Sequence, residues 1–159
     1  MAHDAAKHDA AKYLADIGSH ARIGSMPDIA RTTVSLRITG DMLDPEEITR
    51  LLGIEPTRCT CKGDVRRIAS GRDVIAQVGS WVLSTDTPDG LDAGIGALLG
   101  KLPHDPAVWR DLNERYRCDM FCGLFMQDSK EGAELQPQVL SMLVDRGLRL
   151  GLDIYRCPD

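Results

Sequence analysis

The sequence predicts an α+β fold with a single mixed or antiparallel sheet of about five strands and helices packed on one of its faces. Two observations support this prediction. Segments in which apolar and polar residues alternate lie near both ends of the chain, at 33–39 and 148–155. Between them lie several segments whose apolar residues recur at helical spacing. Strands at both ends with helices interspersed favour one sheet covered by helices.

The first strand and helix are expected within residues 33–53. Val34, Leu36 and Ile38 alternate with polar residues, which is the pattern of a half-buried strand. After a Gly-Asp turn, Asp44 is expected to cap a helix that has proline at its first position and ends at a glycine. A short strand around Cys59 and Cys61 should follow, with both thiols on one side.

The middle of the chain predicts a strand and two helices. Residues 74–84 are apolar on both sides, as in a central strand, and Gly79 marks a bulge or a close approach within it. Helices are then expected over 91–102 and 106–116. Pro103 separates the two helices, and an aspartate caps the second one.

The last third predicts a strand over 118–127, a helix opened by Pro137 and a final strand over 148–155. The apolar residues of that helix, all expected to face inward, are Val139, Leu140, Leu143 and Val144. The resulting order is β-α-β-β-α-α-β-α-β, which is similar to the ferredoxin-like arrangement. The order of the strands within the sheet is not fixed by these patterns.

Several of these segments together resemble a known family. They are LRITGDMLDPEEITRLLGIEPTRCTCKGD, then GSWVLS and finally LDIY. This set, spread over residues 32–157, resembles the bacterial DUF4279 family, a domain of unknown function. The resemblance implies a small stand-alone α+β domain, and it implies no activity.

The chain is therefore expected to consist of an N-terminal extension or leader, residues 1–31, and a DUF4279-like domain, residues 32–159. The extension repeats the pentapeptide HDAAK, whose composition favours helix. Met26 is a candidate natural start, so whether residues 1–25 are native stays open. The histidines of the extension show no metal-ligand spacing, and we read them as solvated.

Composition and charge limit the function classes. The 159 residues are 43% hydrophobic and 27% charged, as in an ordinary globular domain, and the net charge of −5 argues against a nucleic-acid partner. No apolar run reaches the ~20 residues of a membrane span, and no secretory signal is recognisable. We therefore expect a cytoplasmic protein with reduced cysteines.

The cysteines and His104 are the candidates for metal binding or catalysis. Cys59 and Cys61, like Cys118 and Cys122, have the spacing of residues on one face of a strand, so we expect buried thiols rather than zinc ligands. His104 is the one histidine after the extension, and no nucleophile motif or phosphate-binding loop is present. The sequence thus predicts no metal and no cofactor, and it requires no enzyme, although catalysis stays open.

Two groups of residues are candidate binding sites. The first is a basic loop that could receive an anionic group; the alternative is a solvated hairpin loop balanced by Asp64 and Asp73. Its basic residues are Arg58, Lys62, Arg66, Arg67 and Arg72.

The second is the sheet face opposite the helices, where arginines and aromatic rings would suit a binding surface. Its residues are Arg37, Trp81, Asp153 and Tyr155, with Thr39, Arg149, Phe121 and Phe125 joining them. Asp153 is expected to pair with Arg37 or Arg149. This face could equally be a dimer interface or be covered by the N-terminal segment, whereas the signatures of an RNA-binding sheet are missing.

These observations favour a non-enzymatic protein- or ligand-binding module, with an unknown protein partner or a second copy of the chain docking on the open sheet face. One alternative is a small enzyme or sensor that binds an anionic metabolite at the basic loop, between Arg58 and Arg72. Another is a toxin-antidote protein of the immunity type.

Overall fold

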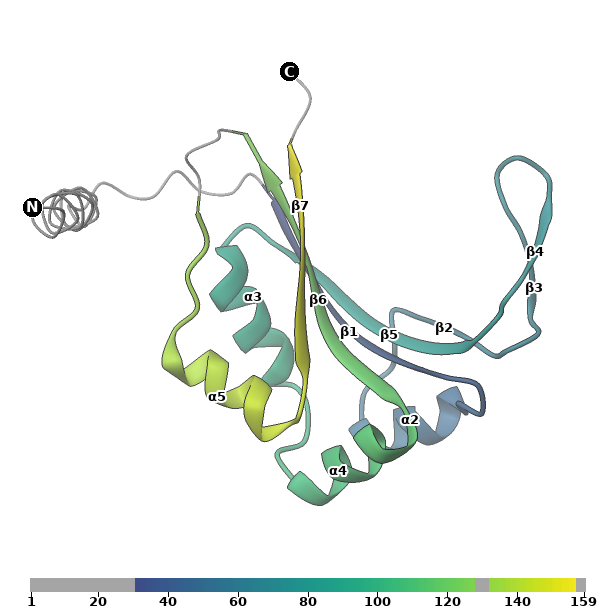
Figure 1. Cartoon of the computed structure of the whole chain (residues 1–159), viewed down its shortest axis with the longest axis horizontal. Coiled ribbons are helices and arrows are strands. Elements are labelled where there is room, and N and C mark those ends of the chain that lie inside the picture. Colours follow the sequence, from purple (N-terminus) through teal and green to yellow (C-terminus); the bar gives the residue numbers. More distant parts are fainter. Residues whose placement is uncertain (1–30, 128–131, 157–159) are drawn as a thin grey trace, which may run out of the picture.

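The computed structural model describes residues 31–127 and 132–156, and it places the helices on one face of a five-stranded sheet (Figure 1). The elements are β1 (Arg31–Gly40), α2 (Pro45–Leu52), β2 (Arg58–Thr60), β3 (Val65–Arg67), β4 (Asp73–Ile75), β5 (Gly79–Thr87), α3 (Gly90–Leu99), α4 (Pro106–Arg115), β6 (Arg117–Met126), α5 (Pro137–Asp145) and β7 (Arg149–Arg156). The prediction of an α+β fold with helices on one face of the sheet is confirmed.

The strands of the main sheet lie in the order β2-β5-β1-β6-β7. β1 is central and runs antiparallel to both β5 and β6, whereas β6 and β7 are parallel, which makes the sheet mixed. β3 and β4 form a separate antiparallel hairpin that stands away from the main sheet (Figure 1). The predicted strand over 74–84 is therefore divided: β4 ends at Ile75, and β5 begins at Gly79.

The helix caps follow the predicted chemistry. The Asp44 carboxylate accepts a hydrogen bond from the backbone N–H of Glu46 at 3.0 Å, Pro45 opens α2, and Gly53 ends it with a φ of 68°. Asp105 caps α4 in the same way. These contacts fix where two of the covering helices begin.

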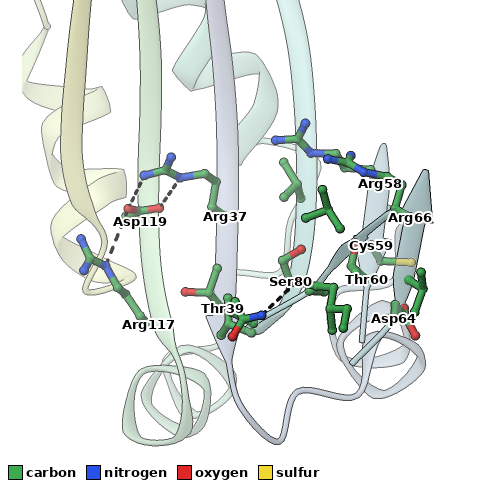
Figure 2. A pocket seen from close by; sticks show the side chains of 17 residues that line it. Arg37, Thr39, Arg58, Cys59, Thr60, Asp64, Arg66, Ser80, Arg117 and Asp119 are labelled. Atoms are coloured by element: carbon green, nitrogen blue, oxygen red, sulfur yellow. Dashed lines mark hydrogen bonds and ion pairs between the residues drawn. The ribbon is translucent and has the colours of Figure 1, made fainter. Parts of the chain in front are cut away.

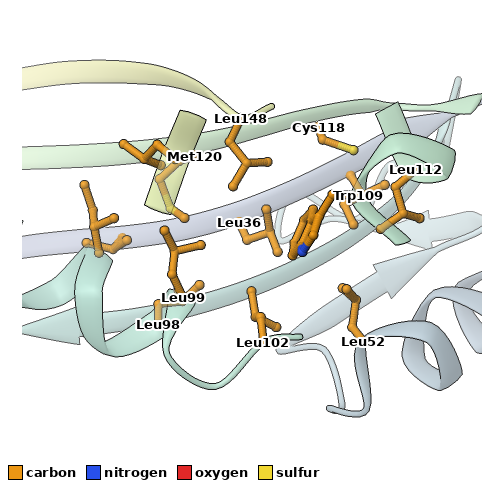
Figure 3. Packing of buried hydrophobic residues seen from close by; sticks show 14 of the residues in the cluster. Leu36, Leu52, Leu98, Leu99, Leu102, Trp109, Leu112, Cys118, Met120 and Leu148 are labelled. Carbon is orange, nitrogen blue, oxygen red and sulfur yellow. The ribbon is translucent and has the colours of Figure 1, made fainter. Parts of the chain in front are cut away.

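The core lies between the sheet and the helices, and Figure 3 shows side chains of both layers meeting there. Val34, Leu36 and Ile38 of β1 are fully buried, as their alternation predicts. Gly79 is a close approach rather than a bulge, because a Cβ there would lie 2.8 Å from the Gly40 carbonyl oxygen.

The expected place of Trp81 on the open sheet face is wrong. Trp81 is fully buried and pairs with Ile38 across β1, so its side chain lies on the helix side of the sheet. Its indole N–H donates to the Thr49 hydroxyl of α2 at 3.1 Å. Residues 74–84 are apolar on both sides, so alternation could not determine which side faces the helices.

Four more residues that were expected to face inward are exposed at the rim of the core. Val139 and Leu143 of α5 are buried, but Leu140 and Val144 are exposed, because α5 contributes only a narrow stripe to the core. Leu148, just before β7, is buried, whereas Leu152 and Ile154 within β7 are exposed. Figure 1 shows the C-terminal end of β7 running past the helices.

Among the described residues, none of the helices has both the length and the apolar character needed to cross a membrane.

Candidate functional site

A groove of about 960 Å³ lies between the open face of the main sheet and the β3–β4 hairpin (Figure 2). Its floor comes from β1, β5 and β6, and its wall comes from β2 and the hairpin. The residues that line it are Arg37, Thr39, Arg58, Cys59, Thr60, Asp64, Val65, Arg66, Val74, Ile75, Ala76, Gln77, Val78, Ser80, Val82, Arg117 and Asp119. The groove joins the two candidate sites that the sequence presented separately, the open sheet face and the basic loop.

The floor is held by an ion pair between neighbouring strands. Arg37 of β1 lies opposite Asp119 of β6 and donates to both carboxylate oxygens, with Nε–Oδ1 at 2.9 Å and Nη2–Oδ2 at 2.7 Å. The Asp119 side chain is only 10% exposed, so this bidentate pair satisfies a carboxylate that water scarcely reaches. These hydrogen bonds raise the pKa of Arg37, so its charge is fixed.

An aromatic ring and a second arginine flank this ion pair. The guanidinium carbon of Arg37 lies 4.1 Å from the centre of the Phe121 ring, which orients the planar group. Arg117 Nε lies 4.0 Å from the same Asp119 carboxylate. One carboxylate therefore lies between two arginines, which leaves the floor with an excess of positive charge.

The wall carries two arginines without an acidic partner. Lys62 and Arg67, both predicted for an anion site, form exposed ion pairs with Asp41 and Asp73, and neither lines the groove. Arg58 and Arg66 have no ion pair among the described residues, and Figure 2 shows both on the hairpin side of the groove. Their planar, multi-donor groups are free to bind a carboxylate or a phosphate.

Apolar residues of the hairpin lie beside these arginines. Val65 is 64% exposed and Ile75 is 55% exposed, and Val74 and Val78 are also exposed. A cluster of exposed β-branched side chains next to cations is typical of a protein-interaction surface. The groove thus combines a cationic wall with an apolar rim.

The remaining predicted residues lie on the same sheet face but outside the groove. Tyr155 of β7 stacks on Phe125 with ring centres 4.9 Å apart, and its hydroxyl donates to Asp153 at 3.0 Å. This hydrogen bond is the main reason why the pKa of Tyr155 is raised. Asp153 was expected to pair with Arg37 or Arg149, but Arg37 pairs with Asp119 instead. β6 lies between β1 and β7, so its Asp119 is the carboxylate next to Arg37.

Asp119 and Arg117 are charged lining residues that the sequence patterns did not single out as functional. The alternation of β6 does place Asp119 opposite the core, on the same face as Arg37. What was missing was the strand order, since β6 had to be recognised as the neighbour of β1 before the two charges could be paired.

The cysteines divide into two kinds. Cys118 and Cys122 are buried as predicted, and burial raises the pKa of each thiol to about 12. Cys59 and Cys61 are exposed, so the expectation of burial is wrong for this pair. β2 is a three-residue strand at the edge of the sheet, and no helix covers that corner. Within the described ranges, no group of three or more metal-ligating side chains is close enough to hold an ion.

His104 lies outside the groove, and its ring is occupied by a structural contact. Arg146 Nη2 lies 3.1 Å from His104 Nδ1, and the same guanidinium donates to the backbone carbonyl groups of Leu99 and Met142. Arg146 therefore ties together the ends of α3 and α5. No histidine of the described chain lines the groove.

A comparison with family models finds one that matches residues 30–156, described as "Domain of unknown function (DUF4279)". No curated protein and no solved structure matches the chain significantly.

Proposed function

The chain belongs to the DUF4279 family, domains of unknown function, and we propose that it is a non-enzymatic binding module that receives an acidic segment of a partner protein in the groove. The observation that carries this proposal is the pair of unpaired guanidinium groups, Arg58 and Arg66, facing a floor that already holds two more arginines.

The charges that line the groove support this proposal. Four arginines and two aspartates line the groove, and one of the aspartates, Asp119, is already bound by Arg37. The other, Asp64, accepts a hydrogen bond from the backbone N–H of Cys61 at 2.7 Å. The groove therefore has a positive excess on a chain whose net charge is −5, and an anionic ligand would be attracted to this place more than to the rest of the surface.

Shape and polarity favour a protein segment over a small molecule. The cavity is at the upper end of the range of roughly 300–1,000 Å³ for small-molecule sites. Its rim leaves Val65 and Ile75 more than half exposed, whereas a small ligand is usually enclosed by such residues. A partner chain could bury this apolar rim and place carboxylates against the arginines, which is the usual division between core and charged positions in interfaces.

A binding role also fits the chemistry of the lining. The hydroxyl groups that line the groove belong to Thr39, Thr60 and Ser80, and none has a histidine beside it to act as a base. Asp119 accepts two hydrogen bonds from the Arg37 guanidinium, which suits a structural carboxylate rather than a proton carrier.

The test is affinity purification from the native cell with the full chain as bait. We expect wild-type protein to retain a partner that Arg58→Glu/Arg66→Glu loses. The matched control is Arg50→Glu/Arg110→Glu, which makes the same change in net charge at exposed positions of α2 and α4 outside the groove. Equal retention by all three baits would contradict the proposal.

A small anionic ligand is the other outcome that the same variants can detect. If the groove takes a metabolite, anionic compounds should raise the melting temperature of wild type and of the control pair, but not of the groove variant, while no protein is retained. That result would keep the site and replace the partner protein by a metabolite.

A further inference from the structure

The outer edge of β7 is a second surface that needs a partner. β7 pairs with β6 along one side, and none of the described residues pairs with its other side. An exposed strand edge presents backbone N–H and C=O groups that readily pair with another strand. The strand reads RLGLDIYR, with apolar residues at alternate positions and charges of both signs between them, so its charges can also pair with a second strand.

The apolar side chains of this strand are also left open. Leu152 is 46% exposed and Ile154 is 65% exposed, although both lie on the helix side of the sheet in register with the buried Cys122 and Leu124. Both side chains are on the helix side of the sheet, and the described residues leave them exposed. Pairing with another strand would cover both the backbone edge and these side chains.

We infer that the occupant is a second copy of this chain, whose β7 pairs antiparallel with the first to form one continuous sheet across a two-fold axis at Gly151. In this register Arg149 of each copy lies opposite Asp153 of the other. Leu150 faces Leu152, and Leu148 faces Ile154. A two-fold axis repeats every contact, so the Arg149–Asp153 pair forms twice.

Charge complementarity selects this register. Arg149 has no ion pair among the described residues, and Asp153 accepts one hydrogen bond, from Tyr155 within its own strand. Centring the axis on Asp153 instead would place two carboxylates opposite each other, which is destabilising. Centring it on Leu152 would place Asp153 opposite Gly151 and leave both charges without an ionic partner.

The proposed dimer does not involve the groove. β7 lies at the opposite edge of the sheet from β2, so a dimer formed through β7 leaves both grooves open. The open-face residues Asp153 and Tyr155, which the sequence singled out for partner or second-subunit binding, take part here through the strand edge rather than through the flat face.

The experiment is sedimentation velocity on the full-length protein, wild type beside Arg149→Asp and Asp153→Arg. Wild type should be a dimer, and each single variant should weaken association roughly tenfold or more, because both cross-strand pairs become like-charged. An equimolar mixture of the two variants should form a heterodimer, since every cross-strand pair is then again of opposite charge. Arg110→Asp, an equal charge change on α4, should remain dimeric.

A chain carrying both substitutions restores the complementarity with itself and should dimerise, which covers the case in which a single variant folds poorly. The inference is overturned if wild type sediments as a monomer at the highest soluble concentration, as it would if another segment of the chain already covered the edge. It is also overturned if the single variants remain as dimeric as wild type, or if neither the mixture nor the double variant regains the dimer.

Discussion

Arg37 and Asp119 join the central strand to its neighbour on the open face of the sheet. The Asp119 carboxylate is almost enclosed, so removing the guanidinium would leave a buried charge with little access to water. Alternation along β1 was enough to predict that Arg37 leaves the core. Its partner could not be predicted, because the pairing depends on which strand lies beside β1, and that is decided by the packing of the whole sheet.

Trp81 and Tyr155 were predicted to share one face, and the structure separates them. Trp81 is fully buried, and its indole N–H donates to Thr49. Tyr155 is 43% exposed, and the one described aromatic ring that it stacks on is Phe125. The sequence of β7 alternates clearly between apolar and other residues, so its faces could be assigned. The predicted strand over 74–84 is largely apolar on both sides, and there only the register with β1 decides.

This difference gives a prediction at the residue scale. Trp81→Ala should lower the free energy of unfolding by about 3–5 kcal/mol, because it removes a large ring from a closed core. Tyr155→Ala should lower it by about 1 kcal/mol, the size of one stacked aromatic contact. Urea melts of the two variants beside wild type measure both values, and equal losses would show that the two rings are buried alike.

The β3–β4 hairpin is the element that turns a flat sheet face into a groove. Its backbone bonds are mostly internal: Ile68 N–H donates to the Arg72 carbonyl at 2.9 Å, and Gly63 N–H donates to the Ala76 carbonyl at 2.8 Å. Its apolar residues are exposed, so little of its surface belongs to the core. A segment held in this way is expected to be less stable than the sheet that carries it.

The sequence predicted the β3–β4 hairpin only in part. The alternative of a solvated hairpin loop was close to the observed structure, since β3 pairs with β4 and Arg67 forms an ion pair with Asp73. β3 was not predicted, and β4 was merged into the predicted strand over 74–84, because the residues of both short strands are exposed on both faces. Without burial there is no alternation of apolar and polar residues for a pattern to detect.

Replacing residues 62–78 by Asn-Gly tests the element directly, because the register that pairs Thr60 with Ser80 then brings residues 61 and 79 to the two ends of the turn. β2 and β5 would then be joined by a tight turn, and the main sheet should keep its cooperative thermal unfolding, because the hairpin contributes little to the core. The groove would be removed, so the partner retained by wild type should be lost. A collapse of the circular dichroism spectrum would show instead that the hairpin supports the fold.

The whole molecule combines an acidic chain with a local basic groove. The net charge correctly describes the average surface, but a sum over the sequence cannot show that Arg37, Arg58, Arg66 and Arg117 converge. The predicted leader, residues 1–31, lies outside the described residues except for Arg31, which opens β1 and stacks on Phe125. Every described residue of the core cluster comes after Arg31.

At this scale, a chain that begins at Met26 should fold as well as the full sequence does. The described core and the match to the DUF4279 family both lie after this position. We expect cooperative thermal unfolding with a melting temperature within a few degrees of the full chain. Loss of cooperativity in the shortened protein would mean that the first residues stabilise the domain.

The central claim is that the partner docks in the groove, and hydrogen-exchange mass spectrometry tests it most directly. The full chain should be measured alone and bound to the protein that it retains from the native cell. We predict that binding slows exchange in peptides from β2, the β3–β4 hairpin and the part of β6 that carries Arg117 and Asp119. Slower exchange confined to α3, α5 or β7, with these peptides unchanged, would contradict the claim.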